Sequence, residues 1–170
     1  MNSIFMFVEE DSEVLQKKLH EFVRSYYKDM YCMNDKDIRL EKESGGKPYI
    51  SINNQVVMLK FNISHAFGVG VVAFSERSIG VDIEKIQEVD YRIVRRFFVE
   101  PEQRYILDGE NEEKRRKRFF EIWTKKEAYL KCKGCGLAGK LKNTNVLEKR
   151  YIYQHIKIDG KEYAMSIHVK

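Results

Sequence analysis

Two acidic residues in a short apolar run are the first candidates for chemistry. Asp82 and Glu84 are two residues apart, within and directly after the run Ile79–Ile83, which has the pattern of a β-strand. Side chains alternate along a strand, so both carboxylates are expected on the same face. A carboxylate in an apolar run is either paired or functional, because a buried charge without a partner is costly. This strand is therefore a candidate site for binding a cation.

A second set of candidates lies on the long helix expected after Asn111. Trp123, Glu127 and Lys131 are spaced four residues apart, so they form one stripe along the helix. If the stripe faces the strand, three carboxylates converge beside one ammonium group. Three oxygen ligands suit Mg²⁺, which also binds substrate phosphates, and Lys131 would neutralise further phosphate charge. The spacing alone fits equally well an ordinary surface pair on the helix and an acid at a strand end.

The elements that must position these residues follow an α+β pattern. A helix capped by Asp11 or Ser12 is expected to reach about Cys32. A helical stretch from about 90 to 108 is interrupted near Pro101, and the long helix stops at Gly134. The expected strands, including a hairpin around residues 159–160, are Ile4–Val8, Pro48–Ile52, Val56–Asn62, Val69–Phe74, Ile79–Ile83, Tyr151–Ile158 and Glu162–Val169.

Polar segments are expected to connect these elements, notably Lys42–Lys47 and Ile63–Gly68. The predicted fold class is α+β, with mostly antiparallel strands and one long packed helix. A chain of 170 residues predicts one domain over residues 1–170, with approximate subdomains 1–75 and 76–170. The apolar fraction of 43% excludes global disorder.

Hydropathy and cysteine content indicate a cytoplasmic protein without a membrane association. No apolar run approaches the roughly 20 residues that span a bilayer, and the first ten residues lack the pattern of a signal peptide. The three cysteines, an odd number, argue against a disulfide framework. Cys132 and Cys135 form a lone C-x-x-C pair without standard spacing to further zinc ligands, so these cysteines are expected to be incidental. Gly134, Gly136 and Gly139 are expected to end the helix and to allow close backbone approach.

Positive charge is concentrated in one segment. Lys114–Lys142 contains eleven Lys or Arg and two acids, a net charge of +9 against +5 for the whole chain. Such a segment attracts a polyanion, whether nucleic acid, a phosphorylated cofactor or an acidic protein. Its run Lys114–Arg118 also fits a solvated helix face. Two alternative functions are thus a basic nucleic-acid-binding module and a magnesium-dependent nuclease, although a nuclease would usually have a Glu-x-Lys pair on a strand.

Several blocks of the sequence together resemble the 4′-phosphopantetheinyl transferase superfamily. Ile79–Glu84, followed by Trp123–Lys131, resembles the signature of this superfamily. Gly46–Pro48 and Phe61–Ala66 are similar to blocks of its larger, Sfp-type branch, and Arg96–Glu102 is similar to the segment that links the signature halves. The blocks occur in the order of the family over more than half of the chain, which is short for that branch.

The resemblance implies a group-transfer reaction with named residues. The 4′-phosphopantetheine arm of coenzyme A would move to a serine of an apo carrier protein, releasing adenosine 3′,5′-bisphosphate. Asp82, Glu84 and Glu127 would hold Mg²⁺, and Lys131 would contact the phosphates. The serine hydroxyl needs a base, for which Glu127 is the first candidate and Glu102 the second.

The resemblance also implies the partners of the reaction. Lys47, Ser64 and His65 would bind the nucleotide end of coenzyme A, with His65 at its 3′-phosphate. The acceptor would be an acidic acyl or peptidyl carrier protein, and neither nucleic acid nor a membrane is the expected partner. The short chain implies a trimmed monomer or a small homo-oligomer whose second subunit completes the site, as in the smaller holo-acyl-carrier-protein synthase branch.

Overall fold

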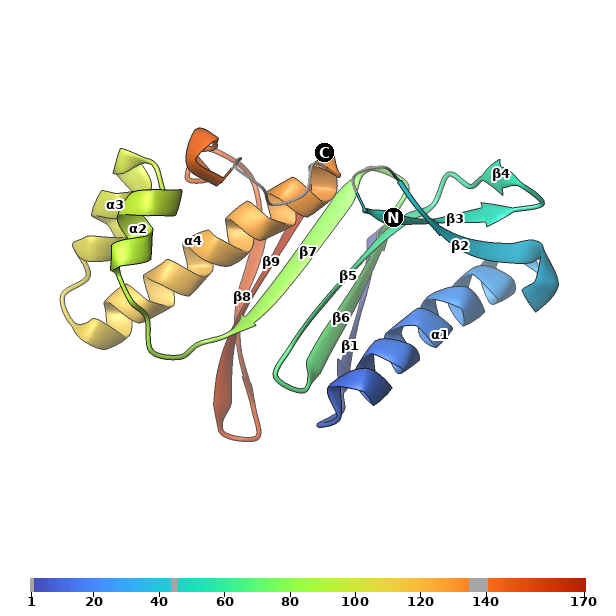
Figure 1. The fold of residues 1–170 in the computed structure, drawn as a ribbon, viewed down its shortest axis with the longest axis horizontal. Helices are drawn as coiled ribbons and strands as arrows, with labels where there is room; N and C mark the ends of the chain where they lie inside the picture. Colours follow the sequence, from blue (N-terminus) through green and yellow to red (C-terminus); the bar gives the residue numbers. More distant parts are fainter. Residues whose placement is uncertain (1, 44–45, 135–140) are drawn as a thin grey trace.

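A computed structural model describes residues 2–43, 46–134 and 141–170. It confirms the α+β fold with antiparallel sheets and one long packed helix (Figure 1). Of the predicted positions, Cys135, Gly136 and Gly139 lie outside the described residues. No helix in the described part of the chain combines the length and apolarity needed to cross a bilayer.

The first half of the chain packs one helix on a three-stranded sheet. The helix begins where Asp11 Oδ1 accepts hydrogen bonds from the backbone N–H groups of Glu13 and Val14. It ends at Cys32, which adopts a left-handed conformation. Its apolar face packs on the sheet in a core that includes Leu19 and Phe74. The elements are β1 (Asn2–Val8), α1 (Ser12–Tyr31), β5 (Lys60–Ala66) and β6 (Val69–Ser75), with strand order β1-β6-β5.

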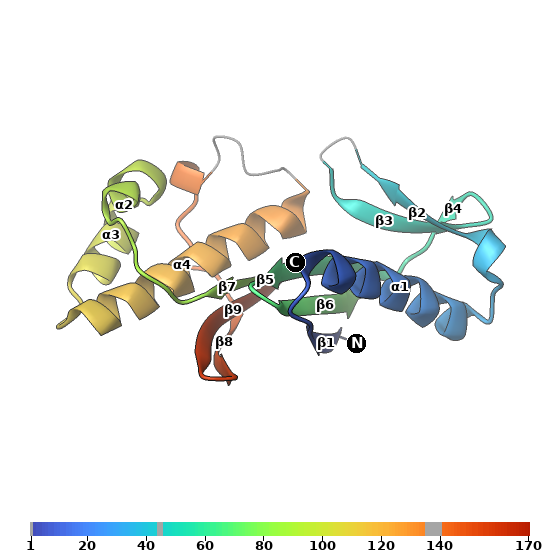
Figure 2. The ribbon, with the colours of Figure 1, turned by 60° about the horizontal axis from the view of Figure 1, so that its bottom comes forward.

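A small second sheet lies beside this half (Figure 2). Its strands pair in the order β2-β3-β4, all antiparallel. Ile38 and Ile50 turn inward and join the core beneath α1. The elements are a 3₁₀ turn η1 (Asp35–Asp37), β2 (Ile38–Lys42), β3 (Pro48–Ile52) and β4 (Gln55–Val56).

The second half repeats the arrangement of a helix on a three-stranded sheet. Asn111 caps the long helix through a hydrogen bond from the Lys114 N–H group, and Gly134 ends it with a φ of 66°. This confirms both predicted ends of the helix. The elements are β7 (Ile79–Lys85), α2 (Arg92–Phe97), α3 (Glu100–Leu107), α4 (Glu112–Lys133), a 3₁₀ turn η2 (Leu141–Asn143), β8 (Ile152–Ile158) and β9 (Lys161–Val169), with strand order β7-β9-β8.

The two halves meet where β5 lies beside β7. Asn62 Oδ1 accepts a hydrogen bond from the Val81 N–H group at 2.9 Å, and Ser64 Oγ accepts one from the Ile83 N–H group at 3.3 Å. Side chains of β5 thus satisfy backbone donors on the edge of β7 that faces it. Behind this seam, apolar residues of β6, β7 and β9 form one buried cluster. The seam fixes the position of β5 relative to β7.

Three sequence-based predictions about the strands were wrong. Ile63–Gly68 is not a connection, because β5 continues through Ala66 and only Phe67 and Gly68 form the turn. The expected strand Val56–Asn62 is interrupted, since β4 ends at Val56 and β5 starts at Lys60. Strand β2 was not expected at all. The polar side chains at the end of β5, such as Ser64, are typical of a loop in the sequence. In the structure they are satisfied by residues of other elements.

Candidate active site

Asp82 lies at the centre of a buried polar network on the face of β7 beneath α4. Its side chain is almost fully buried, with 3% of the residue exposed. Asp82 Oδ1 accepts hydrogen bonds from Lys131 Nζ at 2.6 Å and from Ser64 Oγ at 2.9 Å. Lys131 Nζ also donates to Ser64 Oγ at 2.9 Å. Asp82 Oδ2 is buried and has no hydrogen-bond partner among the described residues.

The close approach of α4 to β7 brings the helix stripe to this network. A Cβ atom on Gly80 would lie 2.0 Å from the carbonyl oxygen of Ala128 and 2.4 Å from the backbone nitrogen of Cys132. Only glycine leaves room for the helix at this distance. Lys131 thereby reaches Asp82, and Trp123 lies near enough to Glu84 to favour the charged form of that carboxylate.

The three carboxylates of the stripe and the strand are electrostatic neighbours. Burial and the nearby Asp82 charge raise the pKa of Glu84 to about 7 and that of Glu127 to about 7. Burial also raises the pKa of Asp82, although Lys131 and Ser64 act in the opposite direction. A cation beside these groups would stabilise their charged forms.

The donor set fits a hard divalent cation by its chemistry. Carboxylate oxygens are the ligands that Mg²⁺ prefers, and Asp82 Oδ2 is a buried acceptor without a partner. Across residues 2–43, 46–134 and 141–170, however, no three His, Cys, Asp or Glu side chains are arranged ready to hold a metal ion. The carboxylates of Asp82, Glu84 and Glu127 are therefore neighbours rather than a preformed ligand set, and one oxygen of Asp82 is engaged by Lys131.

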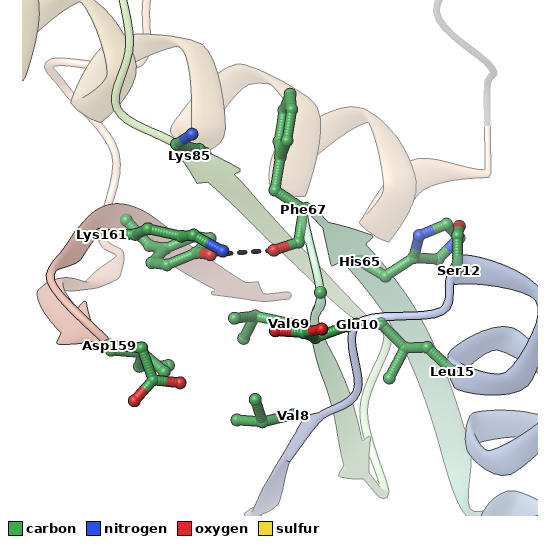
Figure 3. A pocket seen from close by; sticks show the side chains of 13 residues that line it. Val8, Glu10, Ser12, Leu15, His65, Phe67, Val69, Lys85, Asp159 and Lys161 are labelled. Atoms are coloured by element: carbon green, nitrogen blue, oxygen red, sulfur yellow. Dashed lines mark hydrogen bonds between the residues drawn. The ribbon is translucent and has the colours of Figure 1, made fainter.

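The residues predicted to bind a nucleotide lie in three different surroundings. Ser64 belongs to the buried network of Asp82 and Lys131. His65, next along β5, is exposed and lines a pocket of about 460 Å³ with residues at the start of α1 (Figure 3). Lys47 Nζ donates to the carbonyl oxygens of Ile79 at 3.0 Å and of Cys132 at 3.2 Å. The structure thus brings Ser64 to the acidic residues but places His65 apart from them.

Glu102 does not join the acidic residues of β7 and α4. Its carboxylate is fully buried and forms an ion pair of 2.7 Å with Lys126 Nζ. It also accepts hydrogen bonds from the N–H groups of Val99 and Val146. Lys126 Nζ donates further to the carbonyl oxygens of Leu141 and Thr144. These contacts tie α3 and α4 to the segment around η2, which is a structural role.

The basic run at the start of α4 is largely engaged within the chain. Its five side chains contact carboxylates or carbonyl oxygens, and the contacts of Arg116 with Glu88 and of Lys117 with Glu162 join α4 to the segment after β7 and to β9. The remaining contacts are Lys114 with Glu110, Arg115 with the Gly109 carbonyl, Lys117 with Glu113, and Arg118 with the Tyr105 carbonyl. The run thus has a place in the structure that does not require a nucleic acid.

Two residues that shape the site were not singled out from the sequence. Asn62 lies in the block Phe61–Ala66, but its acceptor role at the edge of β7 depends on a contact between the halves. Gly80 carried a usable signal, because an isolated glycine in a strand pattern often marks close backbone approach.

Comparison with known proteins gives a consistent family. A profile of the 4′-phosphopantetheinyl transferase superfamily matches residues 78–170, which contain β7 and α4. Over 116 residues the chain is 35% identical to the 4′-phosphopantetheinyl transferase gsp of Aneurinibacillus migulanus, covering 68% of this chain and 46% of the relative. Over 124 residues it is 33% identical to the 4′-phosphopantetheinyl transferase Sfp of Bacillus subtilis (strain 168), covering 73% and 54%.

The similarity extends to a cyanobacterial relative. Over 104 residues the chain is 35% identical to the 4′-phosphopantetheinyl transferase HetI of Nostoc sp., covering 59% of this chain and 44% of the relative. The chain spans about half the length of the curated relatives it matches. The profile match covers more than half of the chain and includes Asp82, Glu127 and Lys131. The chain therefore belongs to the 4′-phosphopantetheinyl transferase superfamily, in which it is similar to the Sfp-type branch.

Proposed function

We propose that this chain transfers the 4′-phosphopantetheine arm of coenzyme A to a serine of an apo carrier protein. The product would be a holo carrier protein, and adenosine 3′,5′-bisphosphate would leave. The observation that carries the proposal is the meeting of Asp82, Glu84, Glu127 and Lys131 between β7 and α4, in a chain of this family. Phosphoryl transfer depends mainly on positioning and charge stabilisation, which such a cluster supplies.

The acidic residues would act on both the phosphates and the acceptor. Mg²⁺ held by Asp82, Glu84 and Glu127 would supply Lewis acidity to the pyrophosphate of coenzyme A. Glu127 would accept the proton of the carrier serine, because its carboxylate lies beside Asp82 and Glu84, where the phosphates of coenzyme A would bind. The fully buried ion pair of Glu102 with Lys126 makes Glu127 the better base of the two.

The basic and polar residues would position coenzyme A. Lys131 would place its ammonium group at the phosphates, and Ser64 would orient it, because Ser64 Oγ already accepts a hydrogen bond from Lys131 Nζ. His65 would bind the 3′-phosphate, a role that its exposed side chain permits. Lys47 would hold β7 and the end of α4 together beside the nucleotide, through the carbonyl oxygens of Ile79 and Cys132.

The acceptor would be an acidic acyl or peptidyl carrier protein. The segment Lys114–Lys142 carries a net charge of +9, which exceeds the +5 of the whole chain. Opposite charge on a carrier protein would steer the encounter and raise its rate, most strongly at low ionic strength.

One transfer assay tests the proposal directly. The protein is incubated with coenzyme A, Mg²⁺ and several apo carrier proteins, and the intact carriers are weighed by mass spectrometry. We expect one phosphopantetheine to be added to the carrier serine, and we expect chelation of the metal to prevent the addition. Glu127→Ala should reduce the rate at least about 100-fold, which is the usual contribution of a general base.

A matched variant separates a catalytic effect from a general effect on the helix. Glu113→Ala removes another carboxylate of α4, one that is exposed and paired with Lys117. This variant should retain the rate of the unmodified protein. Equal loss of activity in both variants, or no transfer to any carrier protein, would contradict the proposal.

A further inference from the structure

The turn between β5 and β6 contains a bulky residue in an unusual backbone conformation. Phe67 and Gly68 are its two central residues, and both have a positive φ, of 46° and 85°. Two-residue turns of this kind favour asparagine, aspartate or glycine at these positions, because a bulky side chain is strained in the left-handed region. Phenylalanine at the first position therefore makes the turn less stable than asparagine would.

Contacts of the backbone hold Phe67 in this conformation. Ala66 pairs with Val69 across the turn, and the hydroxyl group of Tyr163 donates a hydrogen bond to the Phe67 carbonyl oxygen at 2.9 Å. Tyr163 belongs to β9, so the second half of the molecule holds a turn of the first half. Strained residues that the surrounding structure maintains in this way are concentrated at functional sites. The turn is thus a candidate for a function.

The ring of Phe67 is only partly buried, so packing alone does not explain its presence. Phe67 is 56% exposed. Within the described residues, it is the only exposed large apolar side chain on the turn or on β5, β7 and α4, the elements of the site. Aromatic residues are enriched at protein–protein interfaces, where they often supply most of the binding energy. The ring is therefore available to a partner protein.

The turn lies at one end of the contact between β5 and β7. Phe67 follows Ser64 by three residues, and its ring lies beside Lys85, which directly follows Glu84 at the end of β7. At the other end of this contact, the side chain of Lys47 joins β7 to α4. An acceptor protein that reaches the acidic residues from the end with the turn therefore meets Phe67 and Lys85.

Lys85 adds an available positive charge to the ring. Its Nζ atom lies 5.0 Å from the centroid of the Phe67 ring, and it forms no ion pair with any described residue. Figure 3 shows both side chains toward one end of the pocket, whereas the acidic Glu10 and Asp159 lie toward the other end. The two side chains together are complementary to an apolar residue beside a carboxylate, as an acidic protein would present them.

We propose that Phe67 and Lys85 dock the acidic carrier protein beside the acidic residues of β7 and α4. The inference rests on the proposed transferase function and names residues that select its acceptor. An apolar side chain of the carrier packs on the ring, and a carboxylate of the carrier pairs with Lys85. The pantetheine arm of coenzyme A is the competing occupant, and the two substrates can be separated in one experiment.

Steady-state transfer with each substrate varied in turn tests the contact. Phe67→Asn removes the ring and suits the turn, so it should raise the KM for the apo carrier protein about 10-fold or more. Its KM for coenzyme A should stay constant, and its melting temperature should not fall because the backbone strain is relieved. Met58→Asn is the matched control, since Met58 is 78% exposed but lies outside the turn and the elements of the site. The control should leave both KM values unchanged.

Ionic strength tests the charged part of the contact. Lys85→Gln should raise the KM for the carrier protein several-fold at low ionic strength, and the difference should shrink as salt is added. An unchanged carrier KM in Phe67→Asn, or a raised KM for coenzyme A in its place, would overturn the inference and leave the transferase function intact. Absence of transfer by the unmodified protein would overturn the proposed function and this inference with it.

Discussion

At the residue scale, the site depends on how three carboxylates share a buried space with one ammonium group. Spacing predicted that Asp82 and Glu84 share a face but left open whether the helix stripe meets them; in the structure Lys131 Nζ contacts Asp82. The role of Ser64 as a bridge between Asp82 and Lys131 was not predictable from spacing. It depends on the contact between β5 and β7, which are separated along the chain by strand β6.

The raised pKa values of Glu84 and Glu127 predict a pH dependence of stability in metal-free protein. Both groups have an unfolded pKa of about 4.5 and a folded pKa of about 7, so the folded protein holds protons that the unfolded chain has released. The free energy of unfolding should therefore fall as the pH rises from about 5 to about 8, by on the order of 1–3 kcal/mol. Urea denaturation at several pH values measures this slope.

Urea denaturation of a variant shows how much of this pH dependence is due to Glu84 and Glu127. The double substitution Glu84→Gln and Glu127→Gln should flatten the slope between pH 5 and pH 8, because glutamine does not titrate. Saturating Mg²⁺ should also raise the stability of the unmodified protein at pH 8, since a bound ion stabilises the folded state. An identical slope in the variant would show that other groups cause the pH dependence.

At the element scale, the contact between β7 and α4 decides whether the stripe reaches the strand. The helix ends were predictable because capping is local, from Asn111 at the start to Gly134 at the end. The short strand β2 was not, because Ile38–Lys42 mixes apolar and charged residues and becomes a strand only opposite β3. The capping residues were thus sufficient to predict the ends of α4, whereas the small sheet β2-β3-β4 depends on pairing between strands.

Two strand glycines provide a test of this contact. Gly80→Ala places a Cβ atom against the backbone of α4, which cannot move without displacing Lys131. Gly70→Ala meets mainly the side-chain ends of Leu19, which can rotate. We expect Gly80→Ala to destabilise the protein by about 3 kcal/mol or more and Gly70→Ala by about 1–2 kcal/mol, as measured by chemical denaturation. The reverse order would show that α4 accommodates the methyl group.

At the scale of the whole molecule, two similar halves are joined along β5 and β7. The sequence predicted a division near residue 75, and the sheets of the first and second halves end and begin at Ser75 and Ile79. That division stays a prediction, because the halves share one buried apolar cluster. The side-chain contacts across the seam were beyond sequence analysis, since they form only after both halves have folded.

The seam itself can be tested through Asn62. Asn62→Leu removes the acceptor for the Val81 N–H group and leaves a buried donor unsatisfied, which should cost about 1–3 kcal/mol of stability. Gln154→Leu makes a similar change at an exposed position on β8 and should have little effect. Thermal unfolding of both variants compares their losses of stability. Equal losses would show that the Asn62 hydrogen bond does not stabilise the protein.

The seam has a mechanical consequence for the molecule. Among the described strands, backbone ladders join β5 to β6 and β7 to β9, but β5 and β7 are linked through the side chains of Asn62 and Ser64. The backbone hydrogen bonds between two paired strands resist a pulling force along the strands together, whereas separate side-chain hydrogen bonds break one after another. In an optical trap with handles on the two halves, the first extension should be short and should match the separation of the halves. Ser64 lies on the β5 side of this contact, and Asp82 and Lys131 lie on the other side, so a force that separates the halves would break this network before either sheet opens.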